Sequence, residues 1–367
     1  MTLARPNTMD CLKSIDIGAH TLRNNVFLAP MAGITDAPFR ELCAREQVGY
    51  AASEMISSDS TLHATDKTKH RVMRCNNGLP HAVQIAGSSA SYLADAAEYN
   101  VRLGADIIDI NMGCPAKKVC NKAAGSALLE NPKLVRSILR EVVSRVSVPV
   151  TLKIRTGPNP SARNGHEIAK IAEQEGIACL AVHGRTRSDK FKGSAEYDTI
   201  RRIKQIVSIP VIANGDISCA NDALRVLKYT NADGIMVGRA AQGNPWVFNE
   251  IVSVLAGNAI PERPSNVQIR DTLLTQMNGI YELYGEYRGV RIARKHIAWY
   301  CKGLRNANVF RQRINHVESA KEQTLIIQQF FEKPERFTNA ADTKEINDYR
   351  NLPPELNRHS VGCQQHQ

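Results

Sequence analysis

The sequence predicts a (β/α)8 barrel, also called a TIM barrel, followed by an all-helical C-terminal domain. Three observations lead to this fold class. Eight short apolar runs recur at nearly even spacing between residues 26 and 239, segments of helical periodicity lie between them, and the composition changes after residue 255. Alternating strands and helices predict a parallel sheet, and eight repeats of the unit predict that the sheet closes into a barrel.

The eight apolar runs have the composition of strands that are buried on both faces. Most are continuous rather than alternating, which is typical of parallel sheets. A doubly wound open sheet is the alternative, but it would normally carry a G-x-G-x-x-G motif after its first strand, and this sequence has none. The expected strands are Val26–Met31, Tyr50–Met55, His81–Ala86, Asp106–Met112, Pro149–Ile154, Cys179–Gly184, Pro210–Gly215 and Gly234–Arg239.

The segments between these runs have helical periodicity and recognisable ends. Ala37–Gln47 follows a Thr-Asp pair and carries Pro38 in its first turn, which is typical of a helix start. Ser91–Leu103 is followed by Gly104, the residue preferred just past a helix end. Further helices are expected at Pro132–Val146, Gly165–Glu175, Tyr197–Val207 and Asn221–Tyr229.

The C-terminal third has a different composition. Residues 256–266 (AGNAIPERPSN) resemble a linker. Helical periods then follow at Val267–Tyr284, Arg288–Leu304 and Glu318–Phe331. We therefore expect a barrel domain at 1–255, a helical domain at 256–339 and a mobile tail at 340–367, because the tail has no apolar periodicity.

Composition excludes several classes of protein. The chain has 367 residues, nine scattered cysteines and no C-x-x-C or H-E-x-x-H motif, which argues against a disulfide framework and a metal site. No apolar run approaches the roughly 18 residues of a membrane helix, and the N-terminus has no signal-peptide core. We expect a cytoplasmic monomer. The net charge of +11 favours a polyanionic partner.

Polar residues gather where the predicted strands end, which is where barrel enzymes place their chemistry. The last two loops, ANGDIS and VGRAAQGNP, combine glycines with Arg239 and favour a phosphate site. Lys153 could hold the N1/C2-carbonyl edge of a flavin, and Gln84 could bind the same ring. These positions indicate flavin mononucleotide (FMN). The strand-end residues are Gln84, Asn111, Cys114, Lys153, Arg155, His183, Arg185, Asn214, Asp216, Gly238 and Arg239.

Six motifs, in order along the chain, resemble those of the tRNA-dihydrouridine synthases, most closely the bacterial B type. They are LAPMAGITDAPFR, NMGCPAKKV, TLKIRTG, VHGRTR, ANGDI and GIMVGRAAQGNPW, and the similarity extends from about residue 14 to about residue 335. The resemblance implies an FMN-binding barrel with a C-terminal helical domain and NADPH-dependent reduction of a D-loop uridine in tRNA to 5,6-dihydrouridine. The implied flavin-binding residues are Pro30, Met31, Ala32, Gln84, Lys153, His183, Asn214, Gly215, Asp216, Gly238 and Arg239.

The resemblance also implies that Cys114 is the catalytic acid. Reduction of the uracil C5=C6 bond needs a hydride at C6 and a proton at C5, and a positioned proton donor is worth about a hundred-fold or more. A thiol with a pKa of about 8.5 is protonated at neutral pH. Lys117 and Lys118 close to the sulfur would lower that pKa and favour the thiolate, which conflicts with the role of an acid. We therefore expect these lysines to point at RNA phosphates rather than at the sulfur. Cys120 is expected to be a small buried residue.

A basic helix is the candidate tRNA-binding surface. Between Arg288 and Val317 there are eight Lys or Arg residues and no Asp or Glu. At about 100° per residue, Arg288, Arg291 and Lys295 share one stripe with Trp299, which could stack on a base. The alternative is a solvated basic face with Trp299 packed at a domain boundary. Arg155 and Arg185 are expected to contact the base or its phosphate, or else to form salt bridges at the barrel rim.

Two other functions remain open from the sequence. An FMN barrel could reduce a small-molecule pyrimidine or enone, although such an enzyme does not need a basic helical domain. A tRNA chaperone without catalytic activity would not explain Cys114 and Lys153 at a flavin site. The sequence does not distinguish NADPH from NADH as the reductant.

Overall fold

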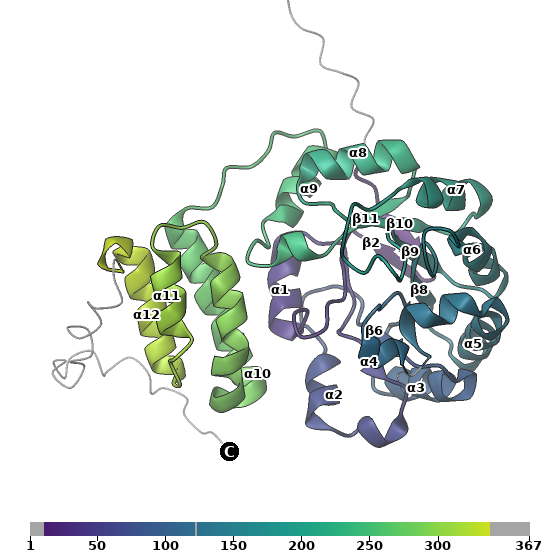
Figure 1. The fold of residues 1–367 in the computed structure, drawn as a ribbon, viewed down its shortest axis with the longest axis horizontal. Coiled ribbons are helices and arrows are strands. Elements are labelled where there is room, and N and C mark those ends of the chain that lie inside the picture. Colours follow the sequence, from purple (N-terminus) through teal and green to yellow (C-terminus); the bar gives the residue numbers. More distant parts are fainter. Residues whose placement is uncertain (1–10, 122, 338–367) are drawn as a thin grey trace, which may run out of the picture.

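The computed structural model describes residues 11–121 and 123–337 (Figure 1). Its main body is a parallel sheet of nine strands, in the order β4-β3-β11-β10-β9-β8-β7-β6-β5. β4 and β5 come from the single predicted second strand, and Ala52 between them forms a bridge to Ala82 on β6. The two edge strands therefore belong to one segment, and the sheet closes into the predicted barrel. The predicted tail at 340–367 lies outside the described residues.

All eight predicted strands are present. The structure shortens most of them and divides the second into two short strands. The barrel strands are β3 (Val26–Leu28), β4 (Tyr50–Ala51), β5 (Ile56–Ser57), β6 (Ala82–Ala86), β7 (Ile107–Met112), β8 (Val150–Arg155), β9 (Cys179–His183), β10 (Val211–Asn214) and β11 (Gly234–Val237).

A two-stranded hairpin that the sequence did not reveal closes the bottom of the barrel. β1 (Ile15–Ile17) pairs antiparallel with β2 (His20–Leu22). Its apolar residues Ile15, Ile17 and Leu22 pack with the lowest inward-facing side chains of the barrel in one buried cluster. Each strand has only three residues, too few for a clear alternating pattern. The hairpin leaves only the opposite end of the barrel open.

The helices cover the outside of the barrel (Figure 1). Asp36 caps α1 by accepting a hydrogen bond from the N–H of Phe39, with a proline in the first turn as predicted. Three helices were not predicted: α2 and α4, which are short, and α9. The helices of this part are α1 (Ala37–Arg45), α2 (Asp66–Arg71), α3 (Ala90–Arg102), α4 (Lys117–Cys120), α5 (Pro132–Arg145), α6 (Gly165–Gln174), α7 (Asp198–Ile206), α8 (Ala220–Thr230) and α9 (Val247–Leu255).

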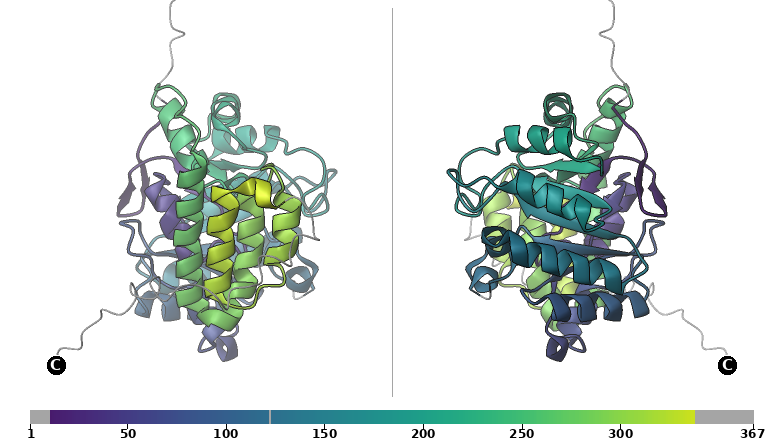
Figure 2. Two further views of the ribbon diagram at one scale, coloured as in Figure 1. Left: turned by 90° about the vertical axis from the view of Figure 1, so that its left-hand side faces the viewer. Right: turned by 90° about the vertical axis from the view of Figure 1, so that its right-hand side faces the viewer.

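Three helices form a bundle beside the barrel (Figure 2). α10 (Asn266–Tyr300) bends sharply at Gly285, whose φ of 72° is left-handed, so it consists of the two helical stretches predicted from the sequence. α11 (Ala307–Ile314) was not predicted, and α12 (Ala320–Glu332) matches the last prediction. These helices share a core that also includes Leu42 of α1. The separation of 256–339 as a domain stays a prediction.

The described residues contain no helix that is long and apolar enough to span a membrane. They also contain no group of three or more His, Cys, Asp or Glu side chains arranged to hold a metal ion.

Candidate active site at the mouth of the barrel

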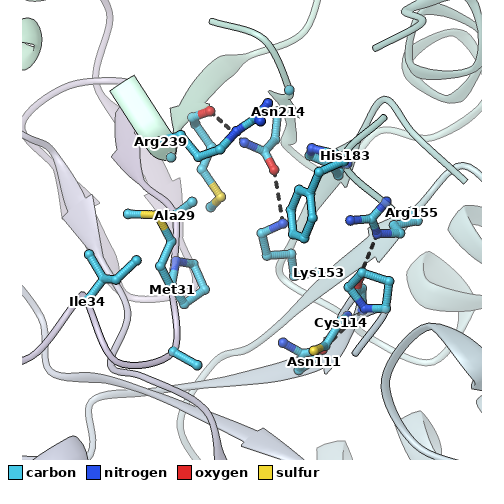
Figure 3. Close-up of a pocket in the computed structure, with 18 of the residues that line it drawn as sticks. Ala29, Met31, Ile34, Asn111, Cys114, Lys153, Arg155, His183, Asn214 and Arg239 are labelled. Carbon is cyan, nitrogen blue, oxygen red and sulfur yellow. Dashed lines mark hydrogen bonds between the residues drawn. The ribbon is translucent and has the colours of Figure 1, made fainter. Parts of the chain in front are cut away.

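A pocket of about 1060 Å³ opens at the carboxyl ends of the strands. The loops after β3, β7, β9, β10 and β11 form its walls, and inward-facing side chains of the strands form its floor (Figure 3). Every residue predicted to be catalytic or flavin-binding lines it, and so does Arg155. These residues are Pro30, Met31, Ala32, Gln84, Cys114, Lys153, Arg155, His183, Asn214, Gly215, Asp216, Gly238 and Arg239.

Lys153 on β8 lies at the centre of the floor. Its Nζ donates a 3.0 Å hydrogen bond to Oδ1 of Asn214, whose Nδ2 donates to the carbonyl of Met236 at 2.8 Å. Burial, reinforced by the charge of Arg155, lowers the pKa of Lys153 to about 8. The ammonium group is thus a poorly solvated cation that is fixed in direction and faces the pocket.

His183 on β9 carries no charge at neutral pH. Burial, together with the positive charges of Lys153 and Arg155, lowers its pKa to about 2. Its Nδ1 is buried and has no hydrogen-bond partner in the described structure. His183 therefore lines the pocket as a neutral imidazole, which has one donor and one acceptor.

The loop after β10 is shaped by Gly215 and Asp216. Gly215 has a φ of 119°, and a Cβ there would lie 2.9 Å from Cβ of Ala195. Burial by itself would raise the pKa of Asp216, but hydrogen bonds from Arg185 and from the Ala195 N–H hold it below its usual range. The Asp216 carboxylate is therefore already hydrogen-bonded within the protein.

Arg185 is a structural residue in this arrangement. Its side chain is 2% exposed and makes two hydrogen bonds to Asp216, of 2.8 and 2.7 Å. Two more of its donors reach the carbonyls of Lys192 and Gly193. Arg185 does not line the pocket. The geometry therefore favours the salt bridge over the expected RNA contact, because the side chain is buried and bonded within the protein.

Arg239 also pairs with Asp216, at 3.1 Å, but its side chain is 56% exposed. It lies at the mouth of the pocket and can turn toward a ligand. Gly238 before it has ordinary φ, and a Cβ there would lie 3.7 Å from Ala29 and 3.8 Å from Met31, inside the pocket. These are ordinary contact distances, so a Cβ at 238 would fit but would take up space at the pocket wall.

Cys114 follows β7 and is half-buried in the pocket wall. Its N–H donates to Oδ1 of Asn111 at 2.9 Å, and its carbonyl accepts from the Ser126 hydroxyl at 2.9 Å. Burial raises the pKa of the thiol, and this outweighs the lowering by the Ala116 backbone and by the charges of Arg155 and Lys153. The thiol is held protonated, as a proton donor requires.

The neighbours of Cys114 differ in part from expectation. Cys120 is half-buried, and its thiol lies 3.5 Å from the carbonyl oxygen of Cys114, so it supports the turn. Lys117 has an exposed side chain at the pocket rim. The side chain of Lys118 lies outside the described structure.

Arg155 joins two loops of the rim. Its guanidinium donates to the carbonyl of Gly113 at 2.8 Å and to those of Thr186 and Lys190 at 2.8 and 2.7 Å. It thus ties the turn that carries Cys114 to the loop after β9. The same guanidinium lies 5.4 Å from the ring centre of Phe191.

Phe191 is a pocket residue that sequence reasoning missed. Its ring is 59% exposed, and the guanidinium of Arg239 lies 5.8 Å from its centre. An exposed aromatic ring next to two cations is available to a flat ligand. A phenylalanine between two lysines, in the stretch SDKFKG, was the one available signal.

The predicted RNA-binding residues of α10 divide into two groups. Lys295 donates to the carbonyl of Gly33 in the loop after β3, and Trp299 packs against Gly243, where an added Cβ would lie 2.5 Å from the Trp299 carbonyl carbon. Both face the barrel. Trp299 is half-buried there, as in the alternative interpretation of a boundary residue. The expected basic stripe is therefore split, because helical periodicity does not reveal which side is covered.

Arg288 and Arg291 lie on the outer side of the same helix. Arg288 is exposed. Arg291 is 3.3 Å from the carboxylate of Glu318 and stacks on Tyr287, with 3.8 Å between its guanidinium carbon and the ring centre. These two arginines remain available to a polyanion.

A closed parallel barrel with a poorly solvated lysine, a neutral histidine, two glycine-rich loops and a protonated thiol around one pocket defines the class of flavin-dependent barrel oxidoreductases. The fold is shared with histamine dehydrogenase from Rhizobium sp. 4-9, at a TM-score of 0.52 and 14% identity over 72% of this chain and 50% of that one. It is also shared with a 2-naphthoyl-CoA reductase, at a TM-score of 0.53 and 12% identity over 68% of this chain and 52% of that one. At such identities the likeness concerns the fold alone.

Sequence comparison identifies the family. The family model described as dihydrouridine synthase (Dus) matches residues 27–341. The tRNA-dihydrouridine synthase B of Pseudomonas syringae pv. tomato is 50% identical over 91% of this chain and 99% of its own length. That of Pasteurella multocida is 51% identical over 86% of this chain and 95% of its own. The chain belongs to the dihydrouridine synthase family.

Proposed function

We propose that this protein reduces a uridine of tRNA to 5,6-dihydrouridine, using FMN and NADPH. The observation that carries the proposal is the pairing of a poorly solvated cation, Lys153, with a thiol held protonated, Cys114, in one pocket. Reduction of an electron-poor C=C bond requires both a hydride source held at a cation and a proton donor. The relatives named for this activity match the chain over nearly their whole length.

The pocket residues fit FMN. Lys153, whose ammonium faces the pocket, and the neutral His183 would hold the polar edge of the ring, and Gly215, Gly238 and the exposed Arg239 would hold the phosphate. Pro30, Met31 and Ala32 would support the ring from the opposite wall. FMN held by these residues would supply hydride transfer from NADPH to C6 of uracil.

Cys114 supplies the second hydrogen. Its thiol gives a proton to C5 of the uracil, and the resulting thiolate is stabilised by the nearby charges of Arg155 and Lys153. The hydrogen bonds to the backbone of Cys114 keep the sulfur at the pocket wall throughout. Protons from solvent restore the thiol before the next turnover.

The target uridine has to leave its stack in the tRNA to reach this pocket, at a cost of a few kcal/mol. Phe191 at the rim offers a surface for stacking, and Arg155 remains a candidate contact for the base or its phosphate. Arg288 and Arg291 of α10 would bind the RNA backbone outside the pocket. We place this reaction in the cytoplasm, where tRNA is found, and expect a monomer to perform it.

The reductant and the RNA would use the pocket in turn, because Cys114 and the predicted flavin-binding residues line the same pocket. A small-molecule enone reductase is the competing proposal, favoured only by the fold. Single-turnover oxidation of the NADPH-reduced protein separates the two. We expect unmodified tRNA to oxidise it rapidly, and cyclohexenone or free uridine to do so much more slowly. Equal rates with cyclohexenone and tRNA would reject the tRNA assignment.

A further inference from the structure

Asp109 lies directly beneath the pocket floor and has no place in the function described above. It is on β7, in register with Gln84 of β6 and Thr151 of β8, and all three side chains point into the barrel. Asp109 is 5% exposed and does not line the pocket. A carboxylate in such a position needs hydrogen bonds to offset its desolvation.

Its two oxygens accept from different neighbours. Oδ1 accepts from the Thr151 hydroxyl at 2.7 Å, and Oδ2 accepts from Nε2 of Gln84 at 2.6 Å. Burial raises the pKa of Asp109, and this outweighs the lowering by the two bonds and by the charge of Lys153. Both oxygens accept a hydrogen bond in this arrangement, which is that of the ionised carboxylate.

The bond to Gln84 is the first link of a chain that ends at the catalytic cysteine. Oε1 of Gln84 accepts from Nδ2 of Asn111 at 2.8 Å. Oδ1 of Asn111 in turn accepts from the backbone N–H of Cys114 at 2.9 Å and from that of Gly113 at 3.2 Å. The order of the chain is Thr151, Asp109, Gln84, Asn111 and the turn at Cys114.

The two ends of this chain have fixed polarity. A backbone N–H can only donate, and a carboxylate can only accept. Each amide between them must therefore turn its oxygen toward Cys114 and its nitrogen toward Asp109. Rotation of either amide by 180° would bring two donors or two acceptors together, in a buried layer where an unmade bond costs about 1–3 kcal/mol.

We propose that Asp109 is a positioning residue for the proton donor, because its carboxylate sets the direction of the Gln84 and Asn111 amides and so fixes the turn that holds the Cys114 thiol. It also determines which polar atoms of Gln84 face the pocket. This inference rests on the proposed function for its consequence in catalysis. The polarity of the chain itself can be tested without the reaction.

Catalysis can be tested with three substitutions that keep the number of side-chain heavy atoms, of which Asp109→Leu adds the most volume. Asp109→Leu removes the acceptor, Asp109→Asn keeps an oxygen for Gln84 while its amide faces Thr151, and Thr151→Val removes only the far partner. We expect Asp109→Leu to slow single-turnover transfer to tRNA by about tenfold or more, with flavin reduction by NADPH changed much less. The other two variants should stay within about threefold of the native rate. Native transfer rates in Asp109→Leu would overturn the proposal.

A reversal of the chain tests polarity in the flavin-free protein. Asn111→Asp places a second acceptor against Gln84, so the chain has acceptors at both ends and thermal unfolding should occur several degrees lower. Adding Asp109→Asn supplies a new amide at position 109. The amides at 84 and 109 can then both turn their nitrogens toward position 111, and every hydrogen bond of the chain is made. We expect the double variant to unfold at a higher temperature than Asn111→Asp alone. Additive losses would refute the fixed polarity, whatever the outcome for activity with tRNA.

Discussion

In the barrel pocket, Lys153 and Arg155 are largely buried, and burial lowers their pKa values to about 8 and about 10. On the outer side of α10, by contrast, Arg288 is exposed and Arg291 shares a surface with Glu318 and Tyr287. Both regions are basic, but their charges are solvated differently. A buried cation acts on one fixed atom, because water cannot screen it. An exposed cation acts over a longer range and is weakened by salt.

This difference in solvation predicts separate roles for the pocket and the helical bundle. In the function we propose, the pocket would provide geometry and proton chemistry, and its substitutions should change rates. The bundle would provide attraction for RNA, and its substitutions should change affinity in a salt-dependent manner. Lys295 is the informative exception, since it belongs to the bundle in sequence but contacts the barrel.

The largest effect is expected for Cys114→Ala. Removal of the proton donor should slow dihydrouridine formation by about a hundred-fold or more, whereas flavin content and flavin reduction by NADPH should remain. Stopped-flow measurement of the two half-reactions checks this. Cys120→Ala is the matched control and should keep most of the activity. Reduction of tRNA by Cys114→Ala at the native rate would contradict the role of Cys114 as the proton donor.

The next largest effect is expected for Lys153→Met, which should lower turnover by about a hundred-fold and weaken the retention of FMN. The native enzyme should also lose activity as the pH rises through about 8, because the ammonium is charged only below its lowered pKa. Lys153→Arg keeps the charge and should shift this limb to higher pH. An unchanged pH profile in that variant would show that another group is titrating.

Charge reversal on the bundle should have a smaller effect. Arg288→Glu is expected to weaken tRNA binding by about tenfold at low salt and less at high salt, because fewer counterions are released. The control is Arg202→Glu, an exposed arginine on α7, far from the bundle (Figure 1). Fluorescence anisotropy at two salt concentrations measures both. Equal losses in the two variants would mean that net charge alone matters.

The smallest effect on RNA affinity should come from Lys295→Met. Its ammonium binds the carbonyl of Gly33, next to Ala32 in the flavin-binding loop, so we expect a few-fold loss of activity with tRNA affinity within about twofold of native. The same anisotropy assay measures the affinity. A loss as large as that of Arg288→Glu would show that Lys295 faces the RNA, as its position on the helical stripe first predicted.

Much of the barrel could be predicted from the sequence, because strand ends of a closed parallel sheet must meet at one face. All of the predicted catalytic and flavin-binding residues line the same pocket for this reason. Phe191 could not be predicted as a pocket residue, because nothing in SDKFKG indicates that its loop folds over that face. The hairpin formed by β1 and β2 could not be predicted because three-residue strands have little periodicity.

The bundle was predicted less well. The apolar Val290 and Ile297 of α10 are buried and Arg288 of the basic stripe is exposed, as expected for an amphipathic helix. It could not indicate that Lys295 and Trp299 are covered by the barrel, since this depends on packing between distant segments. For Arg185, the strand-end position was informative about location but not about partners, and Asp216 takes up its donors.

The most direct test of the account is mass spectrometry of unmodified tRNA after incubation with the FMN-loaded protein and NADPH. The account predicts that one uridine gains two hydrogens in the reaction with the native protein. It also predicts that the same uridine is unchanged in a parallel reaction with Cys114→Ala, although that variant is reduced by NADPH. Unaltered tRNA after complete reduction of the native protein, or an equal gain with Cys114→Ala, would contradict it.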